Sequence, residues 1–176
     1  MKQNLLVTFT SPDRPGIVEL ITSAVVSQGG NWEESRLARL CGDFAGMARI
    51  SVSSERAELL IRKLKNLEVD GLHIAVKQTV DPAAGLKNCR VGTLSCAGAD
   101  HEGIVNRIAT FLARQGINVD ELETSIVPAP TTGTPIFEMN CRLSIPSQLK
   151  SEVLHSDLQE LAGELAVDIS MDVAGQ

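Results

Sequence analysis

The chain has 176 residues, 43% of them hydrophobic, and a formal net charge of −6. Residues 1–80 carry ten Lys or Arg against nine Asp or Glu, whereas residues 81–176 carry six against thirteen. Because this acidic half lacks clustered cations, and aromatic residues for base stacking make up only 3% of the chain, we expect no direct binding to nucleic acid.

In the first half, alternating and helical patterns of apolar residues predict six elements. Strands are predicted over residues 5–10, 31–40, 44–52 and 73–77, and helices over residues 17–26 and 55–66. In the third strand Phe44, Ala48 and Ile50 face one way. At the first helix, Asp13 is placed to accept early helical N–H bonds, and Pro15 suits the first helical position.

The second half repeats this order. Gly103 stands 87 positions after Gly16, and Asn118 stands 87 positions after Asn31. The predicted elements are a strand ending near Cys96, a helix from 104, a strand pair flanking a surface loop at 128–135, a helix over 148–165 and a strand over 167–173. We therefore predict one domain over 1–82, a linker over 83–89 and a second domain over 90–176.

Each half thus reads β-α-β-β-α-β. Two interleaved right-handed crossovers then give an α+β, ferredoxin-like unit, a four-stranded antiparallel sheet with both helices on one face. The other face and the sheet edges are expected to find a partner, either in the other half or in another chain, for example as a homodimer. Arg49 and Arg142 project from this polar face; they either form salt bridges between the units or keep the face soluble.

The four cysteines form no CxxC pair, and no His stands at ligand spacing, so small buried or half-buried thiols in a reducing cytosol are expected rather than a metal site. The N-terminal apolar run is too short for a signal peptide, and no run of about 18 apolar residues occurs. We expect a cytoplasmic protein with no membrane segment and no cofactor.

The turn between the first strand and helix is the candidate binding site for a free amino acid. A helix N-terminus suits the carboxylate, and Gly16 lets a ligand approach the backbone. Asn31 offers an oxygen to the ammonium group and an NH₂ to the carboxylate. The alternative is that these residues only shape a turn and a helix cap. The candidate ligand-binding residues are Asp13, Arg14, Pro15, Gly16, Ile17 and Asn31, with Asp100, His101, Gly103, Ile104 and Asn118 in the second half.

Two equal sites are not expected, because Glu102 in the second turn would repel a carboxylate. Arg14 could pair with a ligand carboxylate or with an acidic patch of a partner. His101 is either a pH-sensitive contact or a solvated loop residue.

The sequence Asp13-Arg14-Pro15-Gly16-Ile17-Val18, with Gly30-Asn31 at the next strand, resembles the signature of ACT domains, the regulatory amino-acid-binding modules. The first half matches better, since the second has His101 and Glu102 in place of Arg14 and Pro15. The resemblance implies a ligand held between this turn and a neighbouring unit. A chain of two such units with Glu34-Ser35-Arg36-Leu37-Ala38 on its second strand also resembles regulators of the family. The resemblance to those regulators implies a glycine-responsive repressor that binds a LysR-type activator of the glycine cleavage system, and not DNA.

Two other functions stay open. A protein-interaction module without a ligand would keep partner binding after Gly16→Trp. A small hydrolase is the second: acylphosphatases share this element order, but here the turn lacks a glycine-rich phosphate cradle and the third strand of the first half lacks a suitable Asn. Formyltetrahydrofolate deformylase begins with an ACT-like unit but needs a separate catalytic domain. No Ser-His-Asp, Cys-His or paired-carboxylate arrangement stands out, so we expect no enzyme.

Overall fold

A computed structural model describes residues 1–68, 71–79, 88–130 and 132–173. The chain divides into two compact units between Ala83 and Ala84, and each unit is described by itself. Most of the predicted linker 83–89 lies outside the described residues, and Cys89 is already the first residue of a strand.

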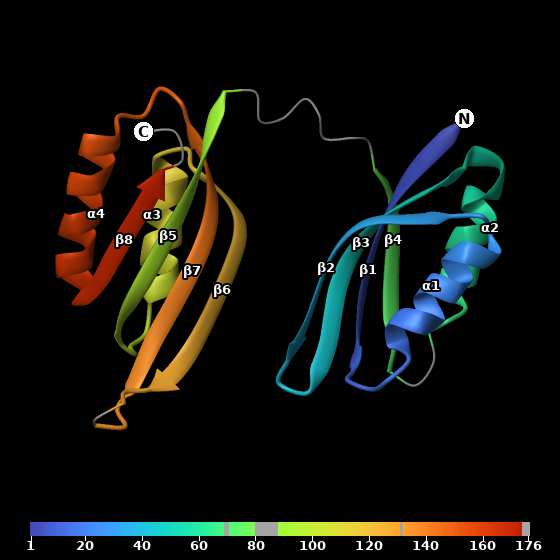
Figure 1. Ribbon diagram of the computed structural model, residues 1–176, viewed down its shortest axis with the longest axis horizontal. Coiled ribbons are helices and arrows are strands. Elements are labelled where there is room, and N and C mark those ends of the chain that lie inside the picture. Colours follow the sequence, from blue (N-terminus) through green and yellow to red (C-terminus); the bar gives the residue numbers. More distant parts are fainter. Residues whose placement is uncertain (69–70, 80–87, 131, 174–176) are drawn as a thin grey trace. The chain divides into compact units, whose positions relative to one another are not determined.

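The first unit has the predicted element order. Its elements are β1 (Lys2–Pro12), α1 (Ile17–Ser27), β2 (Asn31–Leu40), β3 (Asp43–Ser53), α2 (Ser54–Lys65) and β4 (His73–Thr79). The strands form one sheet in the order β2-β3-β1-β4, with every neighbouring pair antiparallel. Both helices cover the same face of this sheet, which confirms the predicted fold (Figure 1).

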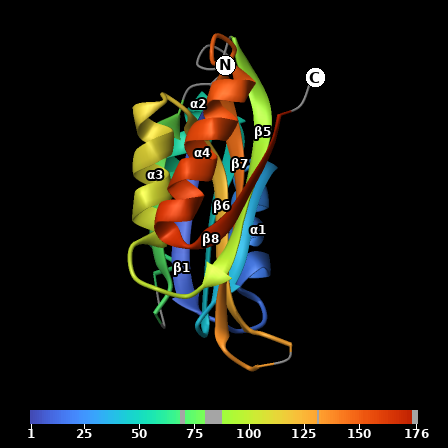
Figure 2. The ribbon, with the colours of Figure 1, turned by 90° about the vertical axis from the view of Figure 1, so that its left-hand side faces the viewer.

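The second unit repeats the first. Its elements are β5 (Cys89–Ala99), α3 (Ile104–Arg114), β6 (Asn118–Pro128), β7 (Pro135–Pro146), α4 (Ser151–Leu165) and β8 (Val167–Val173). The sheet order β6-β7-β5-β8 matches that of the first unit, and α3 and α4 lie together on one face (Figure 2). The helix predicted from 148 begins at Ser151, and the strand predicted to end near Cys96 continues to Ala99.

Each unit has its own hydrophobic core between the sheet and its two helices. The alternation predicted for the third strand is confirmed, because Ala48, Ile50 and Val52 are buried and Met47 is exposed. Burying such a face is the main favourable contribution to folding. No residue belongs to both cores.

The cysteines divide into two pairs. Cys96 and Cys141 are buried in the second core as expected, whereas Cys41 and Cys89 are exposed, contrary to the expectation. Burial raises the pKa of both buried thiols, and for Cys96 the nearby Cys141 and Asp168 add to it. The buried pair is therefore the less reactive one.

Within the described residues, no group of three or more His, Cys, Asp or Glu side chains is placed to hold a metal ion. Among the described helices, none has the length and apolar character needed to cross a membrane.

Candidate functional site

The candidate turn places a glycine in a left-handed conformation immediately before the helix. Gly16 has φ 95°, and its counterpart Gly103 has φ 93°. Side chains rarely tolerate this backbone conformation, which explains the glycine in both units. A Cβ atom at either position would meet nothing within 4 Å, so the space above both turns is open.

The helix that follows begins with backbone N–H groups that have no acceptor within the helix. The first intrahelical bond of α1 runs from the Leu20 N–H to the Gly16 carbonyl at 2.8 Å, and that of α3 from Arg107 to Gly103 at 2.9 Å. The amide groups of the first turn therefore have no acceptor within the helix. Glycine at the cap position has no side chain to serve them. Together with the positive end of the helix dipole, these donors suit a carboxylate.

Asp13 does not cap α1, so that prediction was wrong. Its carboxylate lies 3.5 Å from the Arg39 guanidinium, and its N–H donates to the Gly42 carbonyl at 2.9 Å. These contacts attach the turn to the hairpin between β2 and β3. In the second unit the Asp100 N–H makes the corresponding bond, to the Pro135 carbonyl at 3.4 Å.

Pro15 was also misplaced, because α1 begins at Ile17 and Pro15 lies two positions earlier, before the cap residue Gly16. Ile17 itself is buried in the first core, as is its counterpart Ile104 in the second. These two isoleucines hold the turn against the sheet, while Arg14 is exposed beside it.

His101 is exposed, but both of its ring nitrogens lie within hydrogen-bond distance of backbone carbonyls. Its Nε2 lies 2.8 Å from the Leu165 carbonyl and its Nδ1 lies 3.1 Å from the Glu102 carbonyl. Since both partners are acceptors, the ring satisfies both only when it is protonated. The Leu165 carbonyl raises the pKa of His101 most, and the Glu102 carbonyl and the Asp100 charge raise it further, against the opposing effect of desolvation. Leu165 ends α4, where the helix dipole also favours a cation.

We predict that His101 makes the stability of the second unit depend on pH. Its folded-state pKa lies above that of the unfolded chain, about 6.5. The stabilisation is therefore fully present below about pH 6.5 and is lost as the pH rises through the folded-state value. Thermal unfolding of the wild type and of His101→Gln between pH 5.5 and 9 should show a difference in Tm that shrinks with rising pH. His73→Gln removes a histidine from the first unit as a control, and a constant difference for His101→Gln would refute the prediction.

Asn31 does not lie beside Gly16. The two residues flank α1, whose 11 residues span about 16 Å at the usual helical rise. Gly103 and Asn118 flank α3, which also has 11 residues. A molecule as small as an amino acid does not bridge that distance, so one unit alone does not bring the two halves of the predicted site together.

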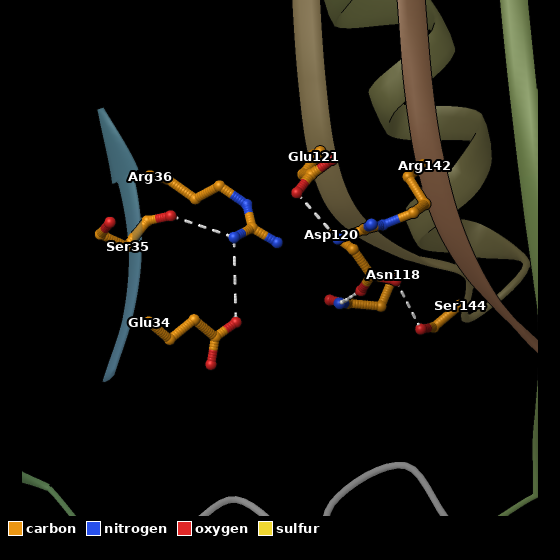
Figure 3. Close-up of polar contacts among 8 residues, drawn as sticks. All are labelled: Glu34, Ser35, Arg36, Asn118, Asp120, Glu121, Arg142 and Ser144. Atoms are coloured by element: carbon orange, nitrogen blue, oxygen red, sulfur yellow. Dashed lines mark hydrogen bonds and ion pairs between the residues drawn. The ribbon is translucent and has the colours of Figure 1, made fainter. Parts of the chain in front are cut away.

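Asn118 belongs instead to a polar cluster at the start of β6 (Figure 3). Its Nδ2 donates to Asp120 at 2.7 Å, and the Ser144 hydroxyl donates to the other Asp120 oxygen at 2.7 Å. Asp120 lies in a bulge between Val119 and Glu121. Arg142 donates to the Glu121 carboxylate at 2.8 Å. The cluster is thus held together by its own hydrogen bonds.

The first unit repeats this cluster, except that its arginine lies close to both acids. Glu33 lies in the equivalent bulge, and Arg49 lies 3.3 Å from Glu33 and 3.8 Å from Glu34. The Ser51 hydroxyl is the largest cause of the lowered pKa of Glu33, and Arg49, Asn31 and Lys2 lower it further against desolvation. The Ser51 hydroxyl is buried and acts on Glu33 through proximity, because none of its contacts with described residues meets the distance and angle limits of a hydrogen bond.

Sequence reasoning missed both bulge acids. The signal was present, because each half has an acid two residues after the Asn and a Ser two residues after the Arg. Arg49 and Arg142 were expected either to form salt bridges between the units or to keep the sheet face soluble. In the structure each pairs with acids of its own unit.

Comparisons with known proteins agree with this geometry. The model of the ACT domain matches residues 3–77. The glycine cleavage system transcriptional repressor of Escherichia coli (strain K12) is 26% identical over 171 residues, which cover 96% of this chain and 89% of the repressor. A crystal structure of an unknown protein from Galdieria sulphuraria is 31% identical, with a TM-score of 0.86 over 99% of this chain and 100% of the other. One ascribed to a glycine cleavage system transcriptional repressor shares the fold, with a TM-score of 0.73 at 21% identity over 100% and 99% of the chains.

The chain is therefore an ACT domain protein built of two ACT units, as the turn and the following Asn indicated. Within that class it resembles the glycine cleavage system transcriptional repressor along nearly its whole length.

Proposed function

We propose that this chain is a regulatory protein that binds a small amino acid, glycine foremost, and so changes its binding to a LysR-type activator of the glycine cleavage system. The observation that carries the proposal is the turn at Gly16, with its left-handed glycine, the open space beside it and the first amides of α1, which have no acceptor within the helix. The similarity to a repressor of that name along 96% of the chain supports the regulatory role. The proposal assigns the chain no catalytic step.

The ligand carboxylate binds the first-turn amides of α1, and Arg14 stands beside this position. Because α1 separates Gly16 from Asn31 by about 16 Å, the Asn31 amide completes a site only from another ACT unit than the one supplying Gly16. A ligand that bridges two units favours the arrangement in which they meet. A coupling of about 1–3 kcal/mol is enough to change the affinity for a partner protein.

The first turn is the ligand site, and the second is not. Glu102 directly precedes the cap residue Gly103, where the first unit has the uncharged Pro15, and its negative charge opposes a carboxylate there. The acid of the first unit, Glu19, lies after the cap, in the first turn of α1. His101 is held by the carbonyl at the end of α4, at the position where the first unit has the exposed Arg14.

Titration calorimetry and thermal unfolding of the full chain with glycine, serine and alanine test the proposal. A ligand at 100 times its Kd stabilises the native state by about 2.7 kcal/mol, so the Tm should rise measurably with glycine. Acetate and methylamine, each carrying one of the two charged groups, should do so far more weakly. Absence of heat and of a Tm shift with every amino acid would refute ligand sensing. Pull-down of the activator with and without glycine tests the second half of the proposal.

A protein-interaction module without a ligand is the second candidate. The long edge strands β2 and β6, with 10 and 11 residues, favour it because each leaves one side without a strand in its own sheet. It predicts that Gly16→Trp leaves activator binding unchanged at every glycine concentration, whereas a sensor loses its response to glycine.

A further inference from the structure

The sheet face opposite the helices, called here the open face of each unit, carries very different charge in the two units. Strand register places on the first open face the cations Lys2, Arg36, Arg49 and Lys77 and the acids Glu34 and Asp43, with Glu33 in the bulge. Arg49 lies close to both Glu33 and Glu34, so it offsets much of their charge. Arg36, on the edge strand β2, lies 3.9 Å from Glu34, and Lys77 stands on the other edge strand, β4.

The centre of the first open face mixes apolar side chains with threonines, and Thr8 of β1 lies between Met47 and Ala75. Met47 is 51% exposed there, opposite Arg36 on β2. Ala45 and Ala75 lie on the same face, opposite neighbouring positions of β1. The exposed Met47 among small and uncharged side chains, between charged edges, is compatible with a protein interface.

The second open face is acidic at the corresponding positions. Glu123 stands where the first unit has Arg36, and Asp172 stands where it has Lys77. The acids placed by register on this face are Glu121, Glu123, Glu138, Asp168 and Asp172, with Asp120 in the bulge. Arg142 is the one cation on the described part of this face, and it pairs with Glu121.

We propose that the first open face binds the second open face of another copy of this chain, in a two-fold dimer in which the pairing occurs twice. Opposite charges at corresponding edge positions favour this pairing over first with first or second with second, which would place like charges together. The proposal goes beyond ligand sensing and does not depend on it.

The area argues for two pairings rather than one. A four-stranded sheet with strands about 4.8 Å apart and about 25 Å long presents roughly 480 Å². One pairing of two such faces buries about 1,000 Å², below the range of about 1,200–2,000 Å² for stable interfaces. Two reciprocal pairings bury about 1,900 Å², which lies inside it. A symmetric dimer is also the commonest closed assembly.

Charge reversal followed by mixing tests this dimer. One variant carries Arg36→Glu and Lys77→Glu on the first open face, and the other carries Glu123→Lys and Asp172→Lys on the second. Each variant alone opposes like charges at both pairings and should dimerise at least tenfold more weakly than the wild type in analytical ultracentrifugation. In an equimolar mixture, both pairings of a mixed dimer again join opposite charges, so dimers should return.

Arg56→Glu with Arg62→Glu is the matched control, because it makes the same change of net charge on exposed positions of α2 and should leave the dimer intact. Circular dichroism checks that each variant is folded. The wild-type dimer should also weaken as salt is raised from 0.05 to 0.5 M. A monomeric wild type, a dimer that both variants retain, or a mixture of folded variants that stays monomeric would each overturn the proposal.

Discussion

Replacing Gly16 by valine should weaken amino-acid binding at least tenfold, whereas the same change at Gly103 should leave it within a factor of two. The reason is local to each turn. At Gly16 a branched side chain would occupy the open space through which a carboxylate reaches the first amides of α1. At Gly103 the corresponding space lies directly after Glu102, whose negative charge stands before α3.

The two substitutions are matched in their effect on stability. Both glycines have nearly the same positive φ, and neither would bring a Cβ into contact with another atom. Each variant should therefore lose a similar free energy of unfolding, roughly 1–2 kcal/mol, from backbone strain alone.

Urea unfolding measures that loss, and titration calorimetry with glycine measures binding. Because stability falls alike in both variants, a difference in binding cannot come from general destabilisation. Equal loss of binding in the two would contradict the assignment of the site to the first unit. Full retention in both would show that no ligand binds at either turn, and would leave the open-face dimer untouched.

Much of the fold could be predicted because its signals are local. The alternation in the third strand needs only neighbouring residues, and the predicted strand over 31–40 coincides with β2. Helix length was also local information. The length of α1 follows from the same local pattern, and it places Gly16 and Asn31 about 16 Å apart.

The partners of polar side chains were harder to predict, because they depend on contacts between distant parts of the chain. Asp13 meets Arg39, 26 residues away, and His101 meets the Leu165 carbonyl, 64 residues away. No pattern of neighbouring residues indicates that either pair meets in the fold. The bulge acids Glu33 and Asp120 are an intermediate case, since their recurrence was visible but their position in a bulge depends on strand pairing.

The difference in charge between the two halves was likewise only partly predictable from the sequence. Composition alone gave an acidic second half. Only the register showed that the contrast falls on equivalent positions of one sheet face, where Arg36 and Lys77 give way to Glu123 and Asp172. The difference in charge between the two halves is thus concentrated on the open faces of their sheets.

Gly98→Ala should destabilise the second unit by about 2–4 kcal/mol and leave the first unit unchanged. A Cβ at Gly98 would lie 2.6 Å from the Val167 Cγ1 and 2.9 Å from its Cα. The first atom belongs to a side chain, but the second belongs to the backbone of the paired strand β8, which cannot move without disturbing the sheet.

Gly163→Ala is the matched substitution with the opposite sign. Gly163 lies in α4, and a Cβ there would meet nothing within 4 Å. Alanine in place of a helical glycine should therefore stabilise the second unit by roughly 0.5–1 kcal/mol.

Trp32, the single tryptophan of the chain, makes the two units separately observable, since it packs against the first core. Urea unfolding followed by its fluorescence reports on the first unit, while circular dichroism reports on both. Because no described residue is shared by the two cores, the fluorescence midpoint should stay constant in both variants while the dichroism curve shifts.

If the fluorescence midpoint follows the substitution in the second unit, the two units are energetically coupled. The dimer of reciprocal open faces would require this coupling once the protein is concentrated enough to assemble. Repeating the measurement above and below the dimer dissociation constant therefore separates independent folding from coupling through the open faces.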